Sequence, residues 1–178
     1  MTVLVAYASR HGSTKGIAER IAEVLTVEGV AAEALPVSDV IDVVEYDAFV
    51  VGGAAYMFRW LKAATAFVTS HRTVLAQHPL WLFSSGPVGT DLVDKDGRDV
   101  TEVLRPKEWE RLEGGLPVRG DRVFFGARDP AAPPVGASER FLGLMPKARA
   151  ALPAGDFRDW DEIEAWAVTI ASELRATR

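Results

Sequence analysis

The stretch that decides the fold is Val3-Leu4-Val5-Ala6-Tyr7, which leads through Ala8 into the loop Ser9-Arg10-His11-Gly12-Ser13-Thr14. The first five residues are apolar throughout, as expected for a strand buried on both faces of a parallel sheet. The next segment, Gly16–Glu28, carries apolar side chains at helical spacing and is followed by Gly29, a common helix stop. The N-terminal residues therefore predict a strand, a short loop and a helix.

The same alternation of short apolar runs and helical patterns continues along the chain, which is typical of βαβ units. The further expected strands are Ala31–Leu35, Ala48–Gly52, Leu80–Phe83 and Arg122–Gly126, and the further expected helices are Trp60–Val74, Lys107–Leu112 and Trp160–Arg175. Five strands with intervening helices predict a doubly wound α/β sheet, in which ligands bind beyond the carboxyl ends of the strands. We expect residues 1–178 to form a single domain, because a chain of 178 residues has the usual length of one domain.

The composition excludes several classes of function. The chain has a formal net charge of -5, and an acidic balance argues against a nucleic-acid partner, which requires a basic surface. The absence of cysteine excludes disulfides, thiolate catalysis and cysteine-ligated metal centres. No spacing of His, Asp and Glu resembles a metal site. The N-terminus has no signal-peptide pattern and no apolar run is long enough to cross a bilayer, so we expect a cytoplasmic protein.

The loop between the first strand and the first helix is the strongest local signal. Free N–H groups at a helix start carry partial positive charge and can hold a phosphate. The loop adds hydroxyl donors, a glycine that permits close backbone approach, and two residues that can add charge. We expect Ser9, Arg10, His11, Gly12, Ser13 and Thr14 to bind a phosphate group. The alternative is an ordinary turn with Ser13 or Thr14 as the N-cap, whereas the P-loop and dinucleotide-binding patterns are absent.

The segment Gly52–Trp60 follows the third expected strand. Its paired glycines would let the backbone approach a planar ligand, and its aromatic side chains can stack on a ring. The alternative for Phe58 and Trp60 is packing against the next helix, which we expect for Trp60, whereas we expect Tyr56 to contact a ligand. The candidate ligand residues of this second loop are Ala54, Ala55, Tyr56, Met57 and Phe58.

A third loop follows the fourth expected strand and is rich in small residues and backbone donors. Its main-chain groups can hydrogen-bond the polar edge of a ring, although a plain turn is the alternative. The candidate residues are Ser84, Ser85, Gly86, Pro87 and Gly89. The three loops lie at the same edge of the predicted sheet and converge at the boundary between the first and third strands, which favours one common ligand.

The first loop resembles the phosphate loop of the flavodoxin family at Ser9, Gly12 and Thr14, and departs from it at His11, where the family has threonine. This resemblance implies a flavodoxin-like five-stranded parallel sheet of order 2-1-3-4-5, with helices on both faces and FMN as cofactor. The position of FMN between the first and third strands is a known property of such folds.

A narrower resemblance involves Ala8–Thr14, Gly52-Gly53-Ala54 and Asp159-Trp160, which are similar to segments of menaquinone-dependent protoporphyrinogen dehydrogenases. It covers residues 1–85 and 122–175, whereas the middle of the chain does not match. It implies an FMN-dependent oxidoreductase with a quinone or a porphyrinogen as substrate. Arg59 and Lys62 favour such an enzyme, because a cation near the flavin raises its reduction potential.

Two other functions remain open. The first is a flavodoxin-type electron carrier with a redox partner protein, and the second is a non-catalytic domain of the same fold. The apolar segment Arg140–Met145 either covers the core or forms a surface for a quinone, a porphyrin or a membrane. Arg128, Lys147 and Arg149 either receive porphyrin propionates or are solvated. The sequence leaves the catalytic residues and the oligomeric state open.

Overall fold

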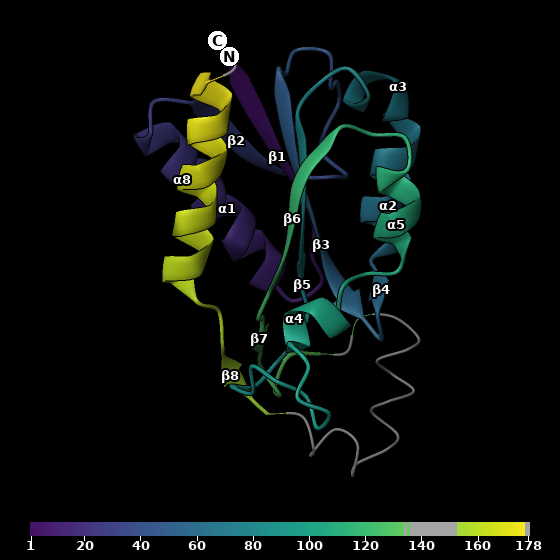
Figure 1. Ribbon diagram of the computed structural model, residues 1–178, viewed down its shortest axis with the longest axis vertical. Helices are drawn as coiled ribbons and strands as arrows, with labels where there is room; N and C mark the ends of the chain where they lie inside the picture. Colours follow the sequence, from purple (N-terminus) through teal and green to yellow (C-terminus); the bar gives the residue numbers. More distant parts are fainter. Residues whose placement is uncertain (134, 136–152, 177–178) are drawn as a thin grey trace.

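The computed structural model describes residues 1–133, 135 and 153–176, and its centre is a parallel β-sheet (Figure 1). The strands of this sheet are β1 (Thr2–Ala8), β2 (Ala31–Pro36), β3 (Ala48–Tyr56), β5 (Leu80–Ser85) and β6 (Val118–Phe124). They are ordered β2-β1-β3-β5-β6, and every neighbouring pair is parallel. Counting only the parallel strands, this is the expected order 2-1-3-4-5, so the predicted flavodoxin-like fold is confirmed.

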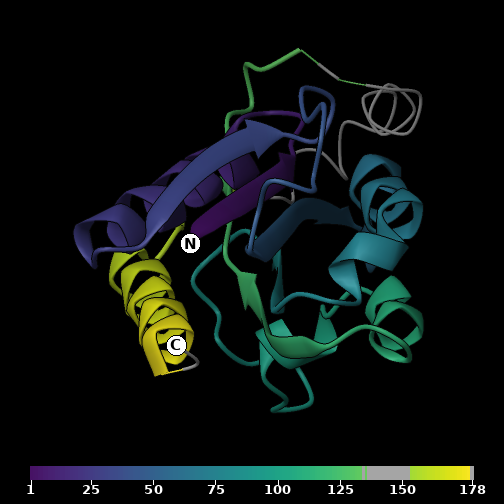
Figure 2. The ribbon, with the colours of Figure 1, turned by 90° about the horizontal axis from the view of Figure 1, so that it is seen from above.

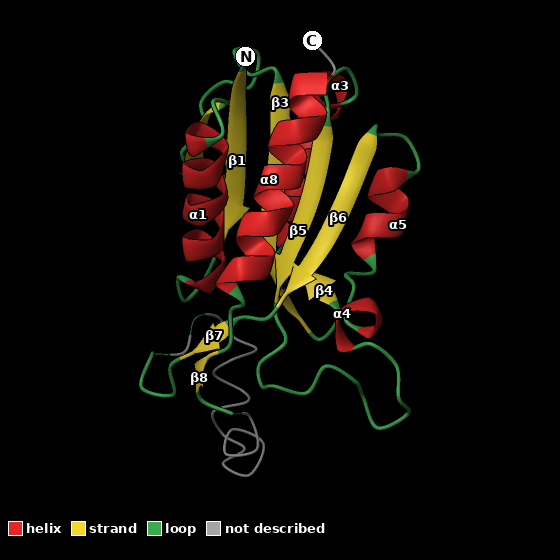
Figure 3. Cartoon of the chain, turned by 60° about the vertical axis from the view of Figure 1, so that its left-hand side comes forward, coloured by secondary structure: helices red, strands yellow, loops and turns green. Residues whose placement is uncertain are grey.

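Helices cover both faces of the sheet, as Figures 2 and 3 show. One face packs against α1 (Ser13–Val27) and α8 (Trp160–Ala176), and the other against α2 (Lys62–Ser70), α3 (Arg72–Leu75) and α5 (Glu108–Glu113). Strand β1 shows why the sheet is buried on both sides. Val3 and Val5 belong to the core under α1 and α8, whereas Leu4 and Ala6 belong to the core on the other face. The continuous apolar run follows from this double burial.

The structure differs from the prediction around Trp60, where the third expected strand ends and the next expected helix begins. Strand β3 continues to Tyr56, and a two-residue turn leads into β4 (Arg59–Trp60), which pairs antiparallel with β3. Trp60 therefore lies in a strand, and the helix predicted to begin there starts at Lys62. The helical stretch is also divided at His71 into α2 and α3. A tertiary strand pairing overrides the helical spacing at the start of this segment.

Strand β6 begins at Val118 and ends at Phe124, so the predicted bounds of 122–126 were shifted. Its first residues, Val118-Arg119-Gly120-Asp121, carry charges because β6 lies at the edge of the sheet. Because of these charges, the apolar pattern did not indicate that the strand begins at Val118. Beyond β6, Gly126 donates its N–H to the carbonyl of Pro87 instead of extending the ladder.

Three short elements beyond the carboxyl edge of the sheet were not predicted. Helix α4 (Val100–Val103) begins at Asp99, whose carboxylate accepts the Thr101 N–H. Strands β7 (Ala127–Arg128) and β8 (Gly155–Asp156) form a two-stranded antiparallel ribbon. The ribbon and α4 lie below the main sheet in Figure 1, at the end where α1 starts. Within the part of the chain that is described, no helix is long and apolar enough to cross a membrane, and no group of acidic or histidine side chains is arranged to hold a metal ion.

Candidate functional site

The three predicted loops meet at the carboxyl edge of the sheet. The loops after β1 and β3 are adjacent because these strands pair directly, with Ala8 opposite Gly53. The loop after β5 lies against the end of β3, since a Cβ added at Gly86 would lie 2.9 Å from the carbonyl oxygen of Ala55. The predicted convergence of residues 9–14, 54–58 and 84–89 is thus present in the fold.

The first loop leaves the start of α1 open. Gly12 is the N-cap residue with a φ of 85°, a left-handed conformation that glycine adopts without strain, and no side chain caps the helix among the described residues. The Gly12 N–H instead donates to the Ser9 hydroxyl at 3.1 Å. The alternative in which Ser13 or Thr14 is the N-cap is therefore wrong. The first amide groups of α1, which lack intrahelical acceptors, present the positive end of the helix dipole to an anion.

The hydroxyl groups of the first loop point in two directions. Ser9 and Ser13 accept hydrogen bonds, from the Gly12 N–H and from the Ala127 N–H at 2.9 Å. Each of these two hydroxyl groups therefore keeps its own hydrogen for donation to another acceptor. Thr14 is fully buried, and its hydroxyl lies 2.7 Å from that of Ser85. Ser9 and Ser13 thus each keep a hydrogen for a further acceptor, whereas the Thr14 hydroxyl is paired with Ser85 and joins α1 to β5.

The turn between β3 and β4 carries the aromatic candidates. Met57 and Phe58 both have positive φ, 51° and 64°, as the two central residues of a tight hairpin turn of type I′ require. Their side chains are exposed, at 84% for Met57 and 40% for Phe58. The Arg10 guanidinium lies 4.7 Å from the centroid of the Tyr56 ring, so a cation–π contact links the first loop to the second. Ala55 and Tyr56 are half-buried and Ala54 is buried beside them.

Trp60 packs in the core, as expected. It is 2% exposed, and its indole N–H lies 3.0 Å from the carbonyl oxygen of Gly53 and 3.2 Å from that of Phe83. The role expected for the paired glycines was wrong. A Cβ at Gly52 would overlap the Phe83 ring, and one at Gly53 would lie 2.6 Å from the Trp60 indole nitrogen. Both glycines lie inside β3 and make room for neighbouring aromatic side chains.

The third loop reaches the surface only in part. Ser84 and Ser85 are the last residues of β5 and are buried, at 0% and 2% exposure. Ser85 contacts Thr14, and the Ser84 hydroxyl has no hydrogen-bond partner among the described residues. Pro87 is also buried, whereas Gly86 is exposed and Gly89 is half-buried. Of the candidate residues in this loop, Gly86 and Gly89 are therefore the ones accessible to a ligand.

Charged side chains in the segments that follow the second and third loops are partly paired. Arg59 lies 3.6 Å from a Glu108 carboxylate oxygen, and the other oxygen accepts the Trp60 N–H. Asp94 is bonded to Arg98 in a loop, and this hydrogen bond holds the pKa of Asp94 below its usual value. Arg128 lies in the β7–β8 ribbon. The segment Arg140–Met145 and the residues Lys147 and Arg149 lie outside the described residues.

Arg158 lies beside the first loop, and the sequence did not indicate this position. The Arg158 guanidinium Nη1 lies 3.5 Å from the Ser13 carbonyl oxygen, and a Cβ at Gly16 would lie 2.5 Å from the same nitrogen. No local pattern connects Arg158 to the first loop, because it lies 145 residues further along the chain.

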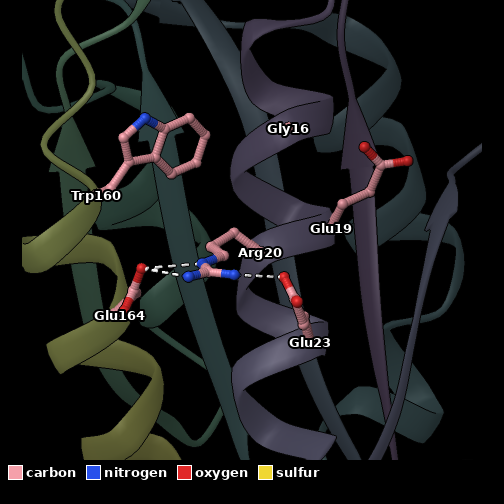
Figure 4. A pocket seen from close by; sticks show the side chains of 6 residues that line it. All are labelled: Gly16, Glu19, Arg20, Glu23, Trp160 and Glu164. Carbon is pink, nitrogen blue, oxygen red and sulfur yellow. Dashed lines mark hydrogen bonds and ion pairs between the residues drawn. The ribbon is translucent and has the colours of Figure 1, made fainter.

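A groove between α1 and α8 lies apart from these loops (Figure 4). Its centre is Arg20, which forms ion pairs with Glu164 across the helix pair and with Glu23 on its own helix. The remaining residues that line it are Gly16, Glu19 and Trp160. None of the predicted site residues lines this groove, and its Arg20–Glu164 ion pair joins α1 to α8.

The fold and the three converging loops define a flavodoxin-like α/β protein. The chain belongs to the flavodoxin domain family, whose model matches residues 4–120. Flavodoxins are FMN-binding proteins, so FMN, the expected cofactor, is that of the family. No curated protein matches the sequence.

Solved structures agree with this fold. A flavodoxin from Streptococcus pneumoniae TIGR4 has a TM-score of 0.60 at 16% identity, with 100% of both chains covered. An archaeal flavodoxin has a TM-score of 0.59 at 17% identity, with 98% of this chain and 99% of that chain covered. Rubredoxin oxygen:oxidoreductase from Desulfovibrio gigas has a TM-score of 0.58 at 14% identity, with 98% of this chain and 36% of that chain covered. The comparisons do not support the narrower resemblance to protoporphyrinogen dehydrogenases.

Proposed function

We propose that this protein binds FMN at the three converging loops and functions as a flavodoxin-type electron carrier. The observation that carries the proposal is the uncapped start of α1, where Gly12 turns the chain and no side chain occupies the first amide groups among the described residues. A dianionic phosphate is the type of group that a helix start with adjacent hydroxyl donors stabilises.

The donor set fits the phosphate of FMN. The Ser9 and Ser13 hydroxyl oxygens each accept an internal hydrogen bond, so their hydrogens remain to be donated. Arg10 and His11 belong to the same loop; Arg10 adds positive charge, and His11 adds a ring N–H that can donate a hydrogen bond. Thr14 contributes indirectly, through its buried contact with Ser85, which fixes the first turn of α1 against β5.

The flavin ring would lie between the second and third loops. Tyr56, Met57 and Phe58 offer aromatic and apolar surface on one side, and Gly86 and Gly89 offer backbone on the other. Ala54 and Ala55 form the floor that connects them. When bound, FMN supplies one- and two-electron transfer, while the protein determines its orientation and its electrostatic surroundings.

The function of an electron carrier is preferred to that of the quinone-linked dehydrogenase that the narrower resemblance implies. Flavodoxin-like proteins transfer electrons to redox partners, which agrees with a partner protein as the electron acceptor. The cationic argument for a dehydrogenase is weakened, because Arg59 is paired with Glu108. The residues considered for a porphyrin or membrane surface, 140–149, lie outside the described residues. Residues 1–178 as a single domain, and a cytoplasmic location, stay predictions.

Two measurements test this proposal. The first is the absorbance spectrum of the purified protein together with calorimetric titration of the apo-protein with FMN. We expect flavin bands and stoichiometric uptake; colourless protein that takes up no FMN would contradict the proposal.

The second measurement separates the carrier from the dehydrogenase. A redox titration of the FMN-loaded protein should show two separate one-electron steps, and the reduced protein should pass electrons to a one-electron acceptor such as cytochrome c. A single two-electron step with rapid turnover of a quinone and a porphyrinogen would instead identify a dehydrogenase.

A further inference from the structure

The β7–β8 ribbon and the segment that follows it contact Ser13 in the first turn of α1. The Ser13 hydroxyl oxygen accepts the Ala127 N–H at 2.9 Å, from the first residue of β7. The Ser13 carbonyl oxygen lies 3.5 Å from Nη1 of Arg158, the second residue after β8. Figure 3 shows the ribbon below the start of α1. Both the side chain and the backbone of Ser13 are therefore held by a part of the chain far away in sequence.

Arg158 is itself held firmly. Its guanidinium makes two hydrogen bonds to Asp156, at 2.8 Å and 2.5 Å, and lies 4.4 Å from the centroid of the Trp160 ring. The hydrogen bonds from Arg158 hold the pKa of Asp156 below its usual value, so both groups are charged at neutral pH. The Arg158 side chain is only 17% exposed. The Asp156 carboxylate and the Trp160 ring together fix the orientation of the Arg158 guanidinium. This side chain is therefore pre-organised for its contact with α1.

Gly16 makes the close approach of Arg158 to α1 feasible. A Cβ at this position would lie 2.5 Å from Nη1 of Arg158, too short for any side chain. Glycine in the interior of a helix costs about 0.5–1 kcal/mol relative to alanine. The helix therefore carries a locally unfavourable residue at the position where the guanidinium lies.

We propose that Arg158 is a positioning residue for the phosphate of FMN, and that it makes the site selective for phosphorylated flavin over riboflavin. The proposal rests on the proposed function. Arg158 acts through Ser13, whose carbonyl oxygen it contacts. The Ala127 N–H donates to the Ser13 hydroxyl oxygen, so the hydroxyl hydrogen of Ser13 is directed to the phosphate. Because Arg158 lies beyond residues 4–120, membership of the flavodoxin domain family does not assign it this role.

The test compares FMN with riboflavin, which lacks the phosphate but has the same ring. Dissociation constants of both flavins are measured by fluorescence titration of apo-protein for the wild type, Arg158→Gln and Arg158→Lys. We expect Arg158→Gln to weaken FMN binding roughly five- to tenfold, the effect of one lost hydrogen bond, and to leave riboflavin binding unchanged. Arg158→Lys keeps the charge and should recover part of the FMN affinity.

Arg175→Gln is the matched control. Arg175 belongs to α8, whereas Arg158 lies just before this helix, and Arg175 contacts the opposite end of α1, where its Nη1 donates to the carbonyl oxygen of Glu28 at 2.5 Å. The substitution changes the net charge equally and also removes a contact to α1, but far from the first loop. The ratio of the two flavin affinities should therefore remain that of the wild type.

Gly16→Ala provides a second route, because it displaces the guanidinium from α1 without removing its charge. It should lower the FMN affinity in the same selective way, and it stands in for Arg158→Gln if that variant does not fold. As an additional probe, inorganic phosphate should raise the melting temperature of wild-type apo-protein more than that of either variant.

An unchanged ratio of FMN to riboflavin affinity in both variants would overturn the inference, as would an equal change in Arg175→Gln. In those cases wild-type protein that still binds FMN tightly would leave the proposed function intact. Wild-type protein that takes up neither flavin would instead overturn the proposed function and the inference together.

Discussion

The hydroxyl oxygens of Thr14 and Ser85 lie 2.7 Å apart, and both residues are buried. This contact connects the first turn of α1 to the last residue of β5, so it fixes the candidate phosphate loop relative to the third loop. A hydrogen bond between two buried hydroxyl groups is costly to break from one side only, because the remaining group keeps no partner.

Thr14→Val should therefore destabilise the protein and weaken FMN binding. Valine has nearly the same shape but leaves the Ser85 hydroxyl buried without a partner, which costs about 1–3 kcal/mol of unfolding free energy. Denaturant unfolding measures this loss, and calorimetry measures the affinity for FMN. Thr14→Ser keeps the hydroxyl and should stay closer to the wild type. If Thr14→Val and Ser85→Ala have additive effects when combined, the two hydroxyl groups are not coupled.

Phe58→Gly separates the strain of the hairpin turn from contact with a ligand. The substitution relieves a positive φ that costs a non-glycine residue roughly 1–2 kcal/mol, and it loses a cation–π contact with Lys107 worth about 0.5–1 kcal/mol. The unfolding free energy should therefore change by no more than about 1.5 kcal/mol, while the affinity for FMN falls. An unchanged affinity would remove Phe58 from the site.

Gly52→Ala should be among the most damaging single-methyl additions to the chain. The new Cβ would overlap the fully buried Phe83 ring, which places the cost at or above the upper end of about 1–3 kcal/mol. Thermal or denaturant unfolding detects it. Gly114→Ala is the control, because its Cβ would meet no atom closer than 3.6 Å. Similar stability of the two variants would show that the Phe83 ring moves freely.

Burial raises the pKa of both Tyr7 and Tyr46, and Tyr46 should titrate unusually late. Burial, followed by a hydrogen bond to Glu33 at 2.7 Å, raises the pKa of Tyr46 to about 12. The folded protein therefore holds this proton between its ordinary value near 10 and 12, where the unfolded chain has lost it, so stability falls as the pH rises through this range. Ultraviolet titration of phenolate formation should show a late step that disappears in Tyr46→Phe. Glu33→Gln should move the step to lower pH, and a wild-type titration without a late step would contradict the assignment.

Much of the candidate site was predictable because its signals are local. The apolar run of β1, the small and hydroxyl-rich loop at 9–14 and the helical spacing of α1 follow one another within one βαβ unit. The carboxyl ends of parallel strands necessarily meet at one edge, so the meeting of the three loops followed from the strand pattern alone. The β3–β4 hairpin was missed because its turn has neither the asparagine nor the glycine that usually marks such a turn.

The sequence by itself determined the alternation of strands and helices, the burial of the sheet on both faces and the absence of thiol chemistry, because each depends on residue type and short-range periodicity. Only the tertiary structure decided which groups meet: Thr14 with Ser85, Gly52 with Phe83, and Ser13 with Arg158. Such contacts join residues up to 145 positions apart, and no local pattern encodes them. The local chemistry of the loop therefore predicted a phosphate ligand, whereas packing decided which hydroxyl groups remain available to hold it.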